Sequence, residues 1–402
     1  MFRRHLVRDL QLALLGAVSG ALAGLASYVF LELLHRVTSY RYRHEGLVWL
    51  LPLAGLVIGV VYHRWAGRAG GGTALAVSEA HAYTQGAPAR MAPLVLGGTL
   101  LGHLFGASVG REGTAVQMSS SITDAAARLV RLDHDHRATL ARAALAGGFG
   151  AVFGVPFAGV VFAMEVARRR TVRALVACVP AAFVGDAVVR ALGYEHTERP
   201  HVQVPFSFGN LVLLVVLGAV FGLTARWFAR AVPALKRLSA RLVPWPPLRP
   251  VLGGAVILVL TLLLGADYLG LSLHLLDSAF AGHTRDWYDA PLKFAFTAIA
   301  LGSGFVGGEV TPLFVIGGTL GSALSSPLGL SPVASAALGL VAVFGAAAQV
   351  PLACTVMAGE LFGAHALVPA LVVCLTARVV AGGDSIYAHP VVPATEPIRS
   401  SV

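Results

Sequence analysis

Four long apolar runs constrain the fold of this chain more than any other feature of its sequence. They reach or approach the length of a bilayer-spanning helix, and they lie at Leu10–Leu34, Leu50–Tyr62, Leu211–Gly222 and Val251–Gly265. Charged residues make up only 12% of the chain, against about a quarter of a typical soluble domain. The 46 glycines agree, because small residues let helices pack closely in lipid. We therefore expect an all-α integral membrane protein.

The positive charges predict how the chain lies in the membrane. The net charge is +10, nearly all of it from arginine, since Lys236 and Lys293 are the only lysines. Arginines cluster in residues 3–8, 168–173 and 226–249, and the positive-inside rule places these segments in the cytoplasm. No motif of aromatic and basic residues accompanies them, so we expect no nucleic-acid partner. The basic N-terminus continues into an apolar run without a clear cleavage site, which indicates a first membrane helix with a cytoplasmic N-terminus.

Two markers occur twice in the chain, in the same order and at similar spacing. Pro156 and Pro351 are each followed nine residues later by a glutamate. A glycine-flanked acid precedes each proline: Glu112, in GREGT, lies 44 residues before the first, and Glu309, in GGEVT, lies 42 residues before the second. This agreement in order and spacing indicates an internal repeat.

The repeat divides the chain into residues 6–192 and 206–388, joined by a polar linker of residues 193–205. We count an odd number of helices in each half, about seven or eight, some of them short and broken by glycine. Such halves have opposite orientations, and in inverted repeats interrupted helices meet near the bilayer midplane, where their ends bind ions. We expect one transmembrane domain of two antiparallel halves, with no regulatory domain after Tyr387.

Each glycine-flanked acid stands at an expected helix start. A helical pattern follows Glu112, and Thr311-Pro312 follows Glu309, with the proline early in the next helix, where its missing N–H costs nothing. The free N–H groups and the positive end of the dipole make such starts anion sites. Ordinary helix-start acids would complement the dipole in the same way, but acids inside membrane segments usually have a function. We therefore expect both halves to aim a helix N-terminus at one shared point.

Other polar groups have simpler interpretations. Residues 133–136, Asp-His-Asp-His, resemble a metal-binding tract but lie between two helical patterns, so we expect a helix cap in a solvated turn. Glu165 and Glu360 are expected to be helix-end acids packed against arginines such as Arg168. His103 is expected to be a buried packing residue, with proton transfer as the alternative. No catalytic triad, nucleotide-binding loop or cluster of metal ligands occurs, so we expect no enzyme, cofactor or metal.

The stretch GREGTAVQM, residues 110–118, resembles the GREG motif of the CLC family of anion channels and proton-coupled anion transporters. The resemblance extends from the first helix to Tyr387. Chloride-handling members usually carry a GxFxP pattern in the second half, whereas residues 307–318 read GGEVTPLFVIGG. This version, with GREGT in place of GREGP, resembles the CLC-F branch of bacterial fluoride/proton antiporters. The resemblance implies a homodimer, with one pathway per subunit, in the lipid of a bacterial inner membrane.

The resemblance also implies roles for single residues. Glu112 matches the gating glutamate, whose carboxylate occupies the anion site and leaves it when protonated. Glu309 and Thr311 match the acid and hydroxyl of the branch motif, with Glu309 a second proton-transfer residue. Tyr387 matches the central tyrosine of the family; the alternative is a residue of the interfacial aromatic belt. Hydroxyls can donate to an anion stripped of water, and fluoride should gain more from them than chloride. The remaining expected anion-binding residues are Thr73, Gly110, Arg111, Gly113 and Val310.

Two departures from the family patterns bear on the function. Proton-coupled chloride members carry paired glutamates where this chain has Glu165 and Val166, so protons must use another acid such as Glu309. The early anion-binding motif of the branch shows glycine followed by asparagine or methionine, whereas residues 70–73 read GGGT, with Thr73 as the candidate donor. The resemblance thus implies fluoride export in exchange for protons. The alternative is a chloride channel or a chloride/proton exchanger.

Overall fold

The computed structural model describes residues 2–167, 172–203 and 208–387. These residues form sixteen α-helices and three short 3-10 helices and no strand longer than an isolated bridge, which confirms the all-α fold. The helices before the linker are α1 (Phe2–Arg43), α2 (Leu51–Trp65), α3 (Gly72–His81), α4 (Met91–Leu104), α5 (Glu112–Leu129), α6 (His134–Phe153), α7 (Pro156–Val166) and α8 (Val172–Ala191). Those after it are α9 (Phe208–Leu242), α10 (Leu248–Leu264), α11 (Leu273–Phe280), α12 (Asp289–Ser303), α13 (Val310–Leu328), α14 (Pro332–Ala348), α15 (Pro351–Phe362) and α16 (Leu367–Ala381).

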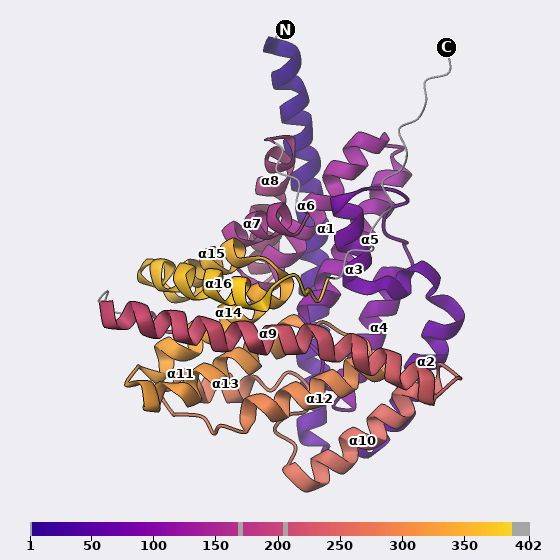
Figure 1. The fold of residues 1–402 in the computed structure, drawn as a ribbon. Coiled ribbons are helices and arrows are strands. Elements are labelled where there is room, and N and C mark those ends of the chain that lie inside the picture. The colour runs from indigo at the N-terminus through magenta and orange to yellow at the C-terminus, as the bar shows by residue number, and fades with distance from the viewer. Residues whose placement is uncertain (1, 168–171, 204–207, 388–402) are drawn as a thin grey trace, which may run out of the picture.

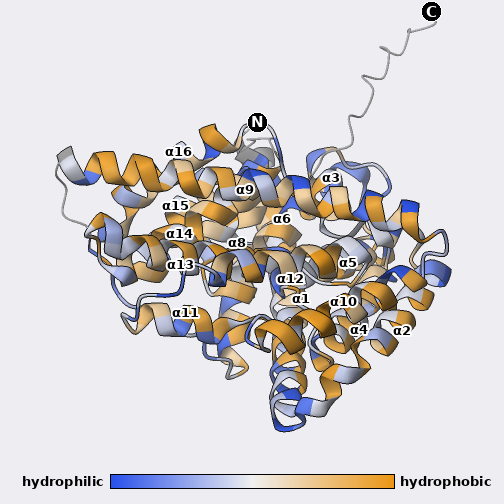
Figure 2. Cartoon of the chain, turned by 60° about the horizontal axis from the view of Figure 1, so that its bottom comes forward, coloured by the Kyte–Doolittle hydropathy of each residue, from blue (hydrophilic) through white to orange (hydrophobic). Residues whose placement is uncertain are grey.

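The long helices α1 and α9 run in clearly different directions, and the other helices pack around them (Figure 1). Within the described residues, five helices are long and apolar enough to cross a bilayer. Hydrophobic colour covers most helices, and hydrophilic colour gathers in the connecting loops (Figure 2). Large apolar side chains face outward on these helices; Val379, for example, is 78% exposed. Such a surface suits lipid as the solvent and confirms an integral membrane protein.

Eight helices lie on each side of the linker in the described part of the chain, which agrees with the expected seven or eight, although the number is even and not odd. Several of them, such as α3 with 10 residues and α11 with 8, are too short to cross a bilayer. The number of helices therefore does not equal the number of crossings.

Glu165 and Glu360 make the same contact in opposite directions. The Glu360 carboxylate accepts hydrogen bonds from the backbone N–H groups of residues 157–158, at 3.0 and 2.7 Å, at the start of α7. The Glu165 carboxylate accepts from those of residues 352–353, at 3.2 and 2.9 Å, at the start of α15. Each acid ends one helix and caps the corresponding helix of the other half, where free N–H groups favour a carboxylate. This exchange is what a two-fold relation between the halves produces; the expected partner Arg168 lies outside the described residues.

The tract at residues 133–136 forms a helix cap, as expected. The Asp133 carboxylate accepts hydrogen bonds from the backbone N–H and the ring Nδ1 of His136, at 2.9 and 2.7 Å, at the start of α6. The backbone hydrogen bond from His136 lowers the pKa of Asp133, which lies outside the membrane-spanning helices. No group of three potential metal ligands occurs among the residues that the structure describes.

Candidate functional site

The two glycine motifs meet through their backbones. Gly110 donates its N–H to the Gly308 carbonyl at 2.6 Å, and Gly308 returns the bond at 2.8 Å. A Cβ on Gly308 would lie 2.6 Å from the Gly113 nitrogen, so only glycine allows this approach. The bridge brings the N-termini of α5 and α13 together, as the repeat predicted.

The Glu112 carboxylate lies on the N-terminus of α13. Its side chain is 0% exposed, and the Thr311 N–H donates to it at 3.0 Å. The Thr311 hydroxyl donates to the same carboxylate. Glu112 therefore does not act as an ordinary first-turn acid of its own helix. Its carboxylate occupies the start of a second helix, which is a natural position for an anion.

Arg111 supplies the charge that partners Glu112. Its Nε lies 3.3 Å from the Glu112 carboxylate and its backbone N–H donates to that carboxylate at 3.2 Å. Its Nη1 donates at 3.5 Å to the hydroxyl of Tyr194, a residue of the linker that sequence reasoning did not select. The ion pair explains how two charged residues fit between the glycines in an apolar segment.

A cavity of about 300 Å³ collects most of the other expected residues. Thr73, Glu309 and Tyr387 line it, and so do Lys236 and Gln117, which sequence reasoning missed. The Gln117 amide Nε2 donates to the Thr73 hydroxyl at 3.0 Å. We call this space the Glu309 cavity. Six separate segments of the chain contribute to it, which is why the sequence did not reveal its full lining.

The start of α13 contributes both to the contact with Glu112 and to the Glu309 cavity. Thr311 points its hydroxyl to Glu112, whereas Glu309, two residues earlier, lines the Glu309 cavity. Val310 lies between them as the first residue of α13 and is buried. Tyr387 is 3% exposed, and its ring meets the Phe162 ring edge-on, with 6.5 Å between centroids. This burial excludes the aromatic-belt alternative for Tyr387.

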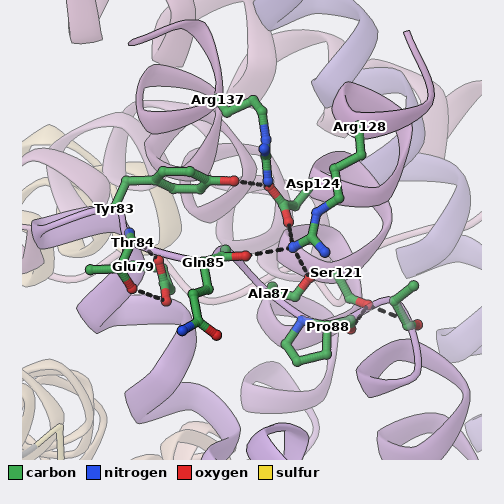
Figure 3. Close-up of polar contacts among 12 residues, drawn as sticks. Glu79, Tyr83, Thr84, Gln85, Ala87, Pro88, Ser121, Asp124, Arg128 and Arg137 are labelled. Atoms are coloured by element: carbon green, nitrogen blue, oxygen red, sulfur yellow. Dashed lines mark hydrogen bonds and ion pairs between the residues drawn. The ribbon is translucent and has the colours of Figure 1, made fainter. Parts of the chain in front are cut away.

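A polar cluster holds the helix that carries Thr73. Arg68, just before the glycine run, donates to Glu79 of α3 at 2.7 Å. The Glu79 carboxylate also accepts from the N–H and the hydroxyl of Thr84, at 2.7 and 2.8 Å (Figure 3). These contacts tie the segments before and after α3 to Glu79 near the end of the helix, and so help to position the helix that carries Thr73.

The neighbouring loop is tied to α5 by a second acid. The buried Asp124 carboxylate accepts hydrogen bonds from the Tyr83 hydroxyl and from Arg128, and Arg137 reaches it at 3.2 Å (Figure 3). The signal that would have identified Glu79 and Asp124 is the scarcity of acids, since buried acids need partners.

The segment before GREG is held by a lysine. Lys293 on α12 is fully buried, and its Nζ donates to the Ser108 and Ser272 hydroxyls, both at 2.9 Å. It also donates to the Tyr268 and Gly270 carbonyls, at 3.1 and 2.7 Å. These neutral partners join Ser108 of the first half to the α10–α11 connection of the second.

His103 is buried, as expected. Its Nδ1 lies 2.9 Å from the Thr99 carbonyl oxygen, and its Nε2 has no partner among the described residues. Both interpretations of His103 therefore remain: the ring packs in the core with Nδ1 against the Thr99 carbonyl, and Nε2 is available for proton transfer.

The sequence of this chain is similar to those of known membrane transport proteins. The sequence model of a family described as "Voltage gated chloride channel" matches residues 54–382. A "Chloride/fluoride channel protein" of Pseudomonas syringae pv. tomato is 42% identical over 343 residues, which cover 83% of this chain and 75% of that protein. An "H(+)/Cl(-) exchange transporter ClcA" of Vibrio vulnificus is 26% identical over 381 residues, covering 85% and 80%.

Solved structures show the same architecture. The crystal structure of a CLC-type fluoride/proton antiporter superposes with a TM-score of 0.91 and 34% identity, covering 94% of this chain and 97% of that one. A slow cyanobacterial Cl⁻/H⁺ antiporter gives a TM-score of 0.83 at 20% identity, covering 94% and 96%. The fluoride/proton antiporter resembles this chain in sequence as well as in fold, whereas the cyanobacterial antiporter shows the fold alone.

Proposed function

The chain belongs to the voltage-gated chloride channel (CLC) family, and from that premise we propose that it exchanges an anion for protons across the membrane. We propose fluoride as the exported anion. The relative from Pseudomonas is named a chloride/fluoride channel protein, and the structure at 34% identity is that of a fluoride/proton antiporter. The observation that carries the proposal is the Glu112 carboxylate on the Thr311 N–H and hydroxyl. Those are the donors that a small, hard anion needs in a site without water.

Glu112 is the proposed gate. Its charged carboxylate takes the donors of α13 and so excludes a free anion from them. Once protonated, it accepts these hydrogen bonds more weakly and leaves, and an anion takes its place on the N-terminus. One movement thus carries a proton and admits an anion. The anion then meets the other proposed binding residues, which are Thr73, Gly110, Arg111, Gly113, Val310 and Tyr387.

Glu309 is the proposed second proton carrier. Where chloride/proton exchangers carry paired glutamates, this chain keeps Glu165 but has Val166 at the second position, so one of the two acids is missing. Glu309, which lines the Glu309 cavity, stands two residues before Thr311 in the chain. The Thr311 hydroxyl in turn donates to the Glu112 carboxylate. Lys236 of the arginine-rich segment 226–249 lines the cavity, so the positive-inside rule favours a cytoplasmic opening. The same rule favours a cytoplasmic N-terminus.

We also propose a homodimer of single-domain subunits, with halves 6–192 and 206–388 joined by residues 193–205. Its interface would use the apolar face around the reciprocal Glu165 and Glu360 caps. Phe157 at the start of α7 and Val368 on α16 are exposed there. In a monomer, lipid would cover this face. We propose a transport function and no enzymatic activity.

Flux measurements in liposomes test the function. Fluoride and chloride efflux are compared side by side while proton movement is recorded. We expect faster fluoride efflux with coupled proton uptake. Thr73, in place of the asparagine or methionine of the branch, favours a chloride channel or chloride/proton exchanger as the second candidate. Faster chloride efflux would establish that candidate and refute the fluoride proposal.

A further inference from the structure

An apolar groove on α9, α10 and α12 leads toward the Glu309 cavity. The groove has a volume of about 270 Å³, and Leu235, Leu238, Leu252 and Val256 contribute to its wall. A second cavity, of about 280 Å³, shares Ser239, Arg249, Gly302 and Ser303 with the groove. The second cavity shares Tyr62, Lys236 and Gly304 with the Glu309 cavity. Three neighbouring spaces with shared walls therefore lie one after another between an outer apolar surface and an inner polar one.

The groove lies on a face that the membrane covers. Leu242 at the end of α9 is 71% exposed, and α9 is one of the helices able to cross a bilayer. Trp245, in the turn between α9 and α10, is 52% exposed. An exposed tryptophan at the end of a membrane helix marks the headgroup region. The apolar groove therefore faces acyl chains, and its polar end lies near the headgroups.

Two positively charged side chains, Arg249 and Lys236, line the second cavity. The Arg249 Nε donates to the Val243 carbonyl at 2.9 Å, and its Nη2 donates to the Pro244 carbonyl at 3.4 Å. These neutral acceptors hold the guanidinium in place but leave its charge without a carboxylate among the described residues. Lys236 likewise forms no ion pair with a described acid. An anionic group would complete both contacts.

We propose that the groove binds one acyl chain of a phospholipid with an anionic headgroup, whose phosphate contacts Arg249 and Lys236. An acyl chain in the apolar groove and a phosphate in the second cavity match the two kinds of lining. The headgroup would then lie at the lateral edge of the space that continues to the Glu309 cavity. This site does not depend on which anion the protein carries.

Lipid binding to the purified protein tests the charged end of the site. Phosphatidylglycerol or phosphatidylcholine with identical chains is added in detergent, and bound lipid is counted by native mass spectrometry. We expect the wild type to retain phosphatidylglycerol preferentially and Arg249→Gln to bind it about tenfold more weakly. Arg249→Lys keeps the charge and should keep the preference. Arg241→Gln, an exposed change on α9 that lies outside the groove lining, is the matched control.

A second variant tests the apolar end of the groove. Val256→Trp fills the groove while leaving Arg249 intact, so bound phosphatidylglycerol should fall although the charge remains. Melting temperatures without lipid confirm that each variant is folded. Equal phosphatidylglycerol binding by the wild type, Arg249→Gln and Val256→Trp would overturn the proposal. So would full protection against thermal unfolding by inorganic phosphate alone.

Discussion

The Thr311 backbone nitrogen lies 3.0 Å from the Glu112 carboxylate, although 199 residues separate them in the chain. The Thr311 hydroxyl donates to the same carboxylate. A side chain from the first half thus occupies the helix N-terminus of the second half. Because a carboxylate and a free anion need the same donors, we expect an anion to bind there only after Glu112 has left.

Glu112→Gln should keep anion flux and abolish proton coupling. Glutamine has the shape of the protonated acid but cannot release a proton. The measurement is proton uptake into liposomes driven by a fluoride gradient, beside fluoride efflux. Glu45→Gln, an exposed change of the same type, should leave both fluxes unchanged. Proton pumping by Glu112→Gln would refute the role assigned to Glu112.

Glu309→Gln should impair coupled exchange in the otherwise unchanged protein. If Glu309 passes protons between its cavity and Glu112, the amide breaks that path while the anion donors of Thr311 remain. The ratio of protons to anions, measured in liposomes, should fall. An unchanged ratio would exclude Glu309 as a carrier, and His103→Asn would then be measured in the same way.

Thr311→Val should lower the preference for fluoride over chloride. The change keeps the shape of the side chain and removes one donor to a dry anion, at a cost of about 1–3 kcal/mol, or roughly five- to hundred-fold in affinity. Chloride depends less on short, strong hydrogen bonds and should lose less. Binding of both anions is measured by calorimetry.

Thr319→Val is the matched control for this change. Thr319 is also buried on α13, but its hydroxyl donates at 2.7 Å to the Val315 carbonyl of its own helix. It should leave the ratio of the two affinities unchanged. An unchanged ratio in Thr311→Val as well would contradict a fluoride site built on that hydroxyl.

Lys293→Met should destabilise the fold, whereas Lys236→Met should not. Removing the buried ammonium leaves the Tyr268 and Gly270 carbonyls without this donor, at a cost of about 1–3 kcal/mol. Lys236 is exposed, and its replacement should change the stability by about 0.5 kcal/mol or less. Thermal unfolding in detergent compares the two. Equal melting temperatures for both variants would exclude a structural role for Lys293.

Much of the fold was predictable because it depends on local features. Apolar runs, glycine content and the small share of charged residues predicted membrane helices, and the repeated Pro–Glu pattern predicted two related halves. The helix starts at Glu112 and Val310 followed from glycine turns and from an early proline. The Asp133 cap followed from the same kind of short-range rule. Apart from the repeat, which compares two halves of the chain, each of these signals lies within one helix or one turn.

The sequence by itself thus determined where the helices begin and which acids stand at their ends. Only the tertiary structure decided that Glu112 lies on Thr311, that Glu165 and Glu360 cap each other's helices, and that Glu309 faces a separate cavity. The physical reason is that a helix N-terminus offers its free N–H groups to any carboxylate that packing brings near. Which carboxylate arrives depends on how helices distant in the chain cross one another, and hydropathy and spacing carry no record of those crossings.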